Sequence, residues 1–316
     1  MKFQTRALMA ATLALSLVGA AHAADKVRVA VAAVYVPFAP IFVAQELGYY
    51  KEKGLDVEAT VYQGGGPAQE AMAAGAADIL TNSPMGAALA ISKGIKQKVV
   101  AAGGTVTPGG WHVIVRKDSG IKTIADLKGK KIGVSAKGSS SDFFALWTAK
   151  HGNVTVQTIP LGGNGLLPAL KNKQVDAIVL WPTFSFRALA DSQLADLVDL
   201  GAVAGEIIPD SVVVSDEMIE KRPDVLKRYL QALMMAVDYM QKHEDWTKKY
   251  LAKYAGEKDP KVLDRAYTDV IMKIRTDGLI KDEWMENSLA LMKLVSADKI
   301  PPLDAVFTKK FLPIKQ

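Results

Sequence analysis

Part of this chain repeats itself at an offset of 98 residues. When Gly54–Pro84 is laid on Gly152–Pro182 without a gap, 7 of the 31 positions are identical. A composition this rich in alanine and glycine gives about two or three identities by chance. The matches fall on helix-ending glycines, Gly-Gly turns and prolines after strands, where backbone geometry is demanding. An array needs at least about three repeats, so two copies predict two similar lobes with a cleft between them.

Both copies alternate short apolar strands with helices. The first copy predicts strands at 27–31, 55–62 and 77–80 and helices at 38–53 and 67–74, and the second predicts strands at 131–134, 154–159 and 175–180 and helices at 141–150 and 165–173. This alternation predicts an α/β fold with a mostly parallel sheet, flanked by helices, in each lobe. Ligands of such sheets bind at the carboxyl ends of the strands, which selects three loops in each lobe.

Two segments predict where the chain crosses between the lobes. Trp111–Lys117 has the pattern of an apolar crossover strand, and Glu206–Val214 marks the return. We expect a discontinuous first lobe, residues 24–116 plus 211–316, and an inserted second lobe, residues 117–210. Closure of the cleft is then a hinge motion at about Arg116–Asp118 and Glu206–Pro209.

The first residues have the features of a secretory signal peptide. Lys2 and Arg6 precede an apolar run, Ala7–Ala20, which is too short to span a bilayer, and Ala21-His22-Ala23 is a cleavage signal. We expect cleavage after Ala23, which makes residues 1–23 the signal. The chain has no cysteine, which excludes a lipid anchor at the cleavage site and thiolate metal sites. These features predict a free periplasmic monomer.

The sequence lacks the features that nucleic-acid binding, nucleotide binding, metal binding and catalysis require. The formal charge of +6 is scattered and not interleaved with aromatic residues, so we expect no nucleic-acid partner. Gly133–Gly138 has the glycine spacing with which a phosphate-binding loop begins. The lysine that should follow is missing, because Ser139 and Ser140 stand there, so nucleotide binding is not expected. His112, His151 and His243 lie in three separate elements, so neither a metal site nor a general base is expected. We therefore predict a protein without cofactor or metal that is not an enzyme.

The selected loops carry aromatic rings and neutral hydrogen-bonding groups. The candidate solute-binding residues are Tyr35, Phe38, Gln63, Asn82, Ser83, Trp111, Gly138, Ser139, Ser140, Ser141, Asn164, Trp181 and Thr183. Ser139–Ser141 precede a helix, whose first N–H groups and positive dipole end attract an anion. Three serines exceed what a helix cap needs, although Asp142 competes for the same dipole. Such a set suits a small organic ligand with a planar or alkyl part and a polar head.

Three stretches resemble a known family. Ala44–Glu58, Val115–Lys130 and Gly138–Ser141 are similar to the signatures of nitrate/sulfonate/taurine-type substrate-binding proteins of ABC importers. The resemblance covers essentially the whole mature chain. It implies a two-lobed type II periplasmic-binding-protein fold, with two crossover strands, that closes on its solute and docks on a membrane permease. The family also includes proteins for pyrimidine vitamin precursors and for aromatic acids.

The residues and the resemblance together predict an importer component that binds a small organic anion, a sulfonate or a carboxylate. Ser139–Ser141 hold the acidic head, and Tyr35, Phe38 and Trp181 enclose the organic part. The six loops contain no arginine, which argues against nitrate or bicarbonate. Two alternatives stay open at this point: a binding protein for a neutral heterocycle such as a pyrimidine, and an exported enzyme on the same fold.

Overall fold

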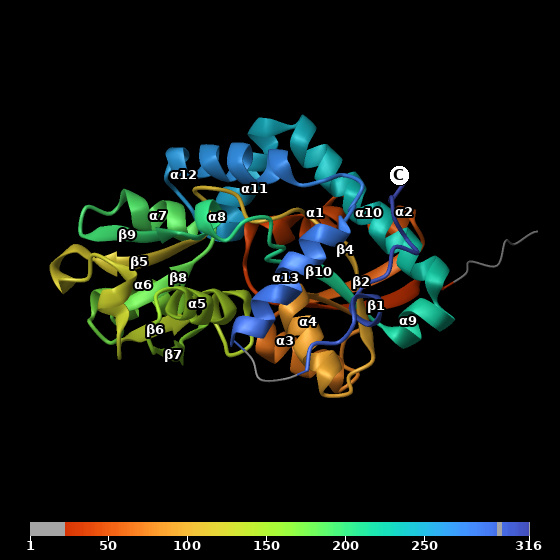
Figure 1. Cartoon of the computed structure of the whole chain (residues 1–316). Coiled ribbons are helices and arrows are strands. Elements are labelled where there is room, and N and C mark those ends of the chain that lie inside the picture. Colours follow the sequence, from red (N-terminus) through yellow and green to blue (C-terminus); the bar gives the residue numbers. More distant parts are fainter. Residues whose placement is uncertain (1–22, 296–298, 316) are drawn as a thin grey trace, which may run out of the picture.

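The computed structural model describes residues 23–295 and 299–315, and it has two halves side by side (Figure 1). Residues 1–22 of the expected signal peptide lie outside the described residues, so its cleavage site stays a prediction.

Each half is built on one sheet of five strands. The first sheet has the order β2-β1-β3-β10-β4 and the second has the order β7-β6-β8-β5-β9. The first contains β1 (Asp25–Val31), β2 (Leu55–Val61), β3 (Ile79–Asn82), β4 (Gln97–Ala102) and β10 (Ser211–Ser215). The second contains β5 (His112–Arg116), β6 (Lys131–Val134), β7 (Gln157–Pro160), β8 (Ala177–Leu180) and β9 (Leu194–Asp199).

The two sheets share one topology. β1 is parallel to β2 and β3, and β6 is parallel to β7 and β8. One strand in each sheet runs against the others: β10 is antiparallel to β3 and β4, and β5 is antiparallel to β8 and β9. β3 starts at residue 79 and β8 at residue 177, which reproduces the offset of 98. The sheets are therefore mixed, with a mostly parallel direction.

The crossing between the halves differs from the expected one. β5 was expected to end the first lobe at Arg116, yet it is hydrogen-bonded within the second sheet. The chain passes between the sheets at residues 103–111 and returns at residues 204–210, and neither connection is a strand. The two connections touch, since Val106 N donates to Ile207 O over 2.8 Å. We therefore propose that the second lobe starts within residues 103–111.

This crossing also moves the first hinge. The guanidinium of Arg116 donates to Leu170 O and Val175 O, at 2.8 and 3.1 Å, so Arg116 is held inside the second lobe. The expected hinge at Arg116–Asp118 is therefore wrong. The expected second hinge, Glu206–Pro209, does lie within a connection.

Helices cover both sheets. Those of the first half are α1 (Ala39–Glu46), α2 (Tyr49–Glu52), α3 (Gly65–Ala73), α4 (Pro84–Ser92), α9 (Asp216–Lys221) and α10 (Pro223–Lys242), with the 3₁₀ turn η1 (Val36–Phe38). Those of the second are α5 (Ser140–His151), α6 (Gly162–Lys171), α7 (Phe184–Ala190) and α8 (Leu200–Val203), with the turns η2 (Lys117–Ser119) and η3 (Ile124–Leu127). The expected helix 38–53 is broken, because Gly48 adopts a left-handed φ of 76° between α1 and α2.

The C-terminal segment contacts both halves. It comprises α11 (Glu244–Ala255), α12 (Pro260–Arg265), η4 (Ala266–Val270), η5 (Ile271–Lys273), α13 (Asp282–Val295) and α14 (Leu303–Val306). α13 packs on α4 of the first half and on α5 of the second, and α12 packs on α7 (Figure 1). An ion pair of 2.7 Å joins Arg187 of α7 to Glu257, which follows α11. The two lobes are thus joined by more than the two connections.

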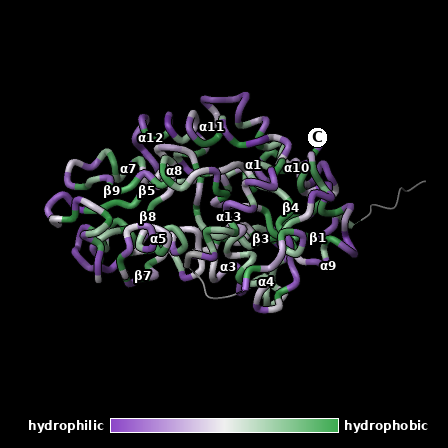
Figure 2. Tube along the Cα trace, viewed as in Figure 1, coloured by the Kyte–Doolittle hydropathy of each residue, from purple (hydrophilic) through white to green (hydrophobic). Residues whose placement is uncertain are grey.

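The apolar residues gather on the strands. Figure 2 shows hydrophobic colour along the inner strands, whereas the outer turns and α11 carry more hydrophilic residues. Tyr229 of α10 and Phe144 of α5 are among the largest fully buried side chains of the two cores. In the described part of the chain, no helix combines the length and the apolar character that crossing a membrane requires.

Candidate functional site

Loops from both lobes meet around one small cavity, here called the inner cavity. Its volume is about 30 Å³. It is lined by Ala32, Ala33, Tyr35, Phe38, Gly64, Gly65, Asn82, Ser83, Trp111, Ser135, Ser139, Ser140, Ser141, Trp181 and Asp210. Nine of these belong to the thirteen residues selected from the sequence. Ligands of such sheets bind at the carboxyl ends of the strands, here called the carboxyl-end rule. Most of the residues that this rule selected from the sequence therefore lie together in the structure.

The two lobes touch at the edge of this cavity. A Cβ atom added at Gly64 would lie 2.5 Å from the Cβ of Ala136, and one added at Gly66 would lie 2.7 Å from the carbonyl oxygen of Lys137. The Ser140 hydroxyl donates to Pro209 O over 2.6 Å, which ties α5 to the second connection. Only glycine allows this approach of the two backbones. The cleft is therefore in a closed arrangement.

Aromatic rings from both lobes form one wall. The Tyr35 ring lies 5.1 Å from Phe38, 6.1 Å from Trp111 and 6.5 Å from Trp181, between ring centroids and in edge-on geometry. Trp111 Nε1 donates to the Tyr35 hydroxyl at 3.3 Å. Behind the ring, the Tyr254 hydroxyl bonds both backbone N and O of Tyr35, each at 3.3 Å. Edge-on pairs are the favoured aromatic arrangement, so this wall is firmly positioned.

The serine loop uses its hydroxyls internally. Ser139 caps α5 by accepting from Asp142 N at 3.3 Å and donates to Ala136 O at 2.8 Å. Ser141 Oγ accepts from Ser135 N at 2.9 Å and lies 2.9 Å from Ser139 Oγ. With Ser140 bonded to the second connection, all three hydroxyls have protein partners. The three serines therefore build the loop, and what α5 offers an anion is the N–H groups and dipole of its first turn.

Asn82 and Ser83 also have structural partners. Ser83 caps α4 by accepting from Gly86 N at 3.0 Å, and its own N donates to Asn82 Oδ1 at 2.9 Å. The Asn82 side chain fills the space beside Gly65, where an added Cβ would lie 2.7 Å from Oδ1. Both residues line the cavity while shaping the loop.

Four candidates lie outside the inner cavity lining. Gln63 and Asn164 are exposed, although Gln63 Oε1 approaches Gly162 of the other lobe. Gly138 forms the turn before α5, with φ of 70° and its N donating to Asp142 Oδ2 at 2.9 Å. Thr183 is buried with a left-handed φ of 61°, which is strained for a β-branched residue. All four residues stay proposals as ligand contacts.

The sequence reasoning missed Asp210, which ends the second connection. Its Oδ2 atom is buried without a hydrogen-bond partner. Burial raises the pKa of Asp210 to about 7, against a smaller lowering by the Tyr35 hydroxyl. A carboxyl group between the apolar Ile207-Ile208-Pro209 and a β-branched strand was the available signal. Trp181 Nε1, across the same cavity, is likewise buried without a partner.

One buried acceptor and one buried donor thus face a shared space without partners. Leaving such groups unpaired costs about 1–3 kcal/mol each, and a ligand that offers a donor to Asp210 and an acceptor to Trp181 would remove this cost. Among the described residues, no cluster of three or more His, Cys, Asp or Glu side chains could hold a metal ion.

Comparisons with known proteins agree with this architecture. A protein of Bordetella bronchiseptica RB50 superposes with a TM-score of 0.80 at 24% identity, covering 91% of this chain and 95% of that one. The alkanesulfonate-binding protein SsuA of Xanthomonas axonopodis pv. citri, solved with MOPS bound, superposes with a TM-score of 0.74 at 18% identity, covering 90% and 99%. The class of protein is therefore defined: the chain has a type II periplasmic-binding-protein fold.

The sequence comparison narrows this class to a family. Residues 36–246 match the family described as NMT1/THI5 like, and the chain belongs to it. A Brucella abortus (strain 2308) protein, named provisionally as a binding protein, is 27% identical over 314 residues, or 95% of each chain. The 4-amino-5-hydroxymethyl-2-methylpyrimidine phosphate synthase of Schizosaccharomyces pombe is 24% identical over 211 residues, covering 62% of this chain and 60% of that one. The relatives of this chain thus include proteins named as binding proteins and one named as a synthase.

Proposed function

We propose that this chain is the periplasmic solute-binding component of an ABC importer. It captures a small organic solute between its lobes and delivers it to a membrane permease after export. The two-lobed fold, the family and the alkanesulfonate-binding structural relative support this role. The observation that carries it is that two buried atoms without a hydrogen-bond partner, Asp210 Oδ2 and Trp181 Nε1, belong to residues lining one cavity between the lobes.

Two solute classes compete for the cleft. An organic anion, the class expected from the sequence, would place its acidic head at the first turn of α5. A neutral heterocycle would donate an N–H to Asp210 and accept from Trp181. The second class is favoured by the buried carboxyl of Asp210, which repels an anion when ionised, and by the serine hydroxyls that already have partners. We therefore place a solute with an N–H donor ahead of a simple anion.

An exported enzyme on this fold is the remaining alternative. The yeast relative named as a synthase keeps this alternative open. Among the described residues, those lining the inner cavity include no histidine or lysine, so Asp210 is the one lining residue with a carboxyl group that could act as an acid or a base. Recovery of the bound compound unchanged after denaturation would argue against turnover.

The test begins with the protein as purified. Mass spectrometry of compounds released by denaturation identifies a retained solute, and a thermal-shift screen compares sulfonates, aromatic acids and pyrimidines. Stabilisation by pyrimidines and loss of it in Trp181→Phe support the favoured class. Stabilisation by sulfonates alone would instead favour an organic anion as the solute. The proposal is overturned if no small molecule stabilises the protein and no solute is retained.

A further inference from the structure

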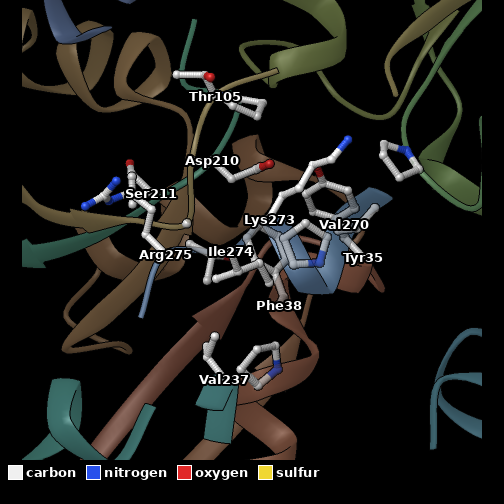
Figure 3. Close-up of a pocket in the computed structure, with 18 of the residues that line it drawn as sticks. Tyr35, Phe38, Thr105, Asp210, Ser211, Val237, Val270, Lys273, Ile274 and Arg275 are labelled. Carbon is white, nitrogen blue, oxygen red and sulfur yellow. The ribbon is translucent and has the colours of Figure 1, made fainter. Parts of the chain in front are cut away.

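A larger cavity, here called the outer cavity, also has Tyr35 in its lining. Its volume is about 300 Å³, against about 30 Å³ for the inner one. Its walls come from the first connection, from Leu233 and Val237 of α10, and from Ile274 and Trp284 of the C-terminal segment. Val237 and Ile274 are labelled in Figure 3. Well-packed interiors leave few voids larger than a water molecule, and this volume is at the small end of ligand pockets.

The two cavities share four lining residues: Tyr35, Phe38, Trp111 and Asp210. Figure 3 shows the Asp210 carboxyl and the Tyr35 side chain pointing into the outer cavity. The Tyr35 hydroxyl accepts from Trp111 on its other side. Asp210 is therefore the one acidic residue among the four shared ones, and its Oδ2 is buried without a hydrogen-bond partner, whereas a hydrogen bond with the Tyr35 hydroxyl lowers the pKa of the carboxyl group.

Two of the three other charged groups that line the outer cavity have a charged partner. Arg275 pairs with Asp277 at 2.6 Å, and Asp269 pairs with Arg265 at 3.1 Å. Lys273 is exposed at the rim. A ligand in this cavity would thus meet largely apolar walls together with two buried polar atoms that have no hydrogen-bond partner, Asp210 Oδ2 and Trp284 Nε1.

We propose that the outer cavity receives the body of the transported solute, and that this solute joins an apolar body of about one ring to a basic N–H head that donates to Asp210. Amidines and amines with an aryl or branched alkyl body have this chemistry. The inference rests on the proposed function, since it assigns the place and class of the same solute. The inner cavity then holds only the edge of the head group, as its small volume requires.

The probes for the test are three planar compounds of one shape: benzamidine, benzamide and benzoate. Calorimetric titration of the full chain is expected to show benzamidine binding at least about tenfold more tightly than benzoate, because a charge-assisted hydrogen bond to a carboxylate adds to the apolar contact. Benzamide, which is uncharged, falls between them. Asp210→Asn removes the preference for benzamidine.

The location is tested by filling the cavity. Val237→Phe and Leu233→Phe put a ring into the outer cavity and are expected to abolish benzamidine binding while leaving the melting temperature of the unliganded protein near that of the wild type. Val203→Phe, at an exposed position, is the matched control and leaves binding intact.

Two results overturn the inference and leave the proposed function standing. One is benzamidine binding that persists in both cavity-filled variants, which places the solute in the cleft. The other is a solute retained through purification when none of the three probes binds. If no probe binds and no solute is retained, both proposals fall.

Discussion

Asp210→Asn is expected to change how stability depends on pH. Burial raises the pKa of Asp210 from 3.8 to about 7, a difference of about three pKa units, which corresponds to about 4 kcal/mol. The folded protein holds the Asp210 proton more tightly than the unfolded chain does. The stabilisation that results is therefore fully present at pH values below the pKa that Asp210 has in the unfolded chain. It is lost as the pH rises through about 7. Asparagine stays neutral throughout and removes this dependence.

The measurement is urea unfolding, followed by tryptophan fluorescence, at about pH 4 and about pH 8. Between about pH 4 and about pH 8, the free energy of unfolding of the wild type is expected to fall by up to about 4 kcal/mol more than that of Asp210→Asn. This is an upper bound, since separation of the lobes would return the carboxylate to water. Glu206→Gln is the control, because Glu206 lies exposed in the same connection. A stability difference between wild type and Asp210→Asn that does not change with pH would refute the burial argument.

Three further substitutions test the closed cleft. Gly66→Ala adds a Cβ atom only 2.7 Å from the carbonyl oxygen of Lys137, which is too close for both to stay in place, so scattering should show a more open molecule. The control Gly165→Ala, whose added Cβ meets its nearest neighbour at 3.4 Å, should not open it. Ser140→Ala loses the 2.6 Å bond to the second connection and should lower the free energy of unfolding by about 1 kcal/mol in urea titration; an unchanged value would contradict this. Trp181→Phe keeps the ring but removes the donor, so a solute that accepts from it should bind about fivefold or more weakly by calorimetry.

The fold was predictable because the repeat and the strand pattern are local signals. The strand at 131–134 was placed at its observed bounds, and β3 and β8 keep the predicted spacing. The break at Gly48 was missed because the apolar face of α1 and α2 continues across it, whereas glycine adopts the left-handed φ of 76° without steric cost. The sequence also could not tell which sheet β5 joins, since an apolar strand is compatible with either sheet and its neighbours in the fold decide.

The site was predictable in its location more than in its chemistry. The carboxyl-end rule needs only strand order, which explains why Tyr35 and Trp181 meet although 146 residues separate them. The rule says nothing of whether a hydroxyl is free, and Ser139 and Ser141 are bonded to their own loop. Asp210 follows a connection instead of a parallel strand, so the rule could not select it. Its importance comes from burial, which is a property of the folded state.

We expect Asp210 to couple solute binding to closure. With the lobes together, its Oδ2 is buried, and a pKa of about 7 means that the carboxyl is partly ionised near neutral pH. An ionised and unpaired carboxylate opposes closure, while a donor from the solute removes this opposition. A ligand shifts an equilibrium only by its difference in affinity for the two states, and this pairing is available only in the closed one. A solute with a basic N–H should therefore favour closure more strongly at about pH 8 than at about pH 5, whereas an anion should show the reverse order. Scattering on the protein with benzamidine and with benzoate at both pH values separates the two, and equal responses would show that Asp210 takes no part in closure.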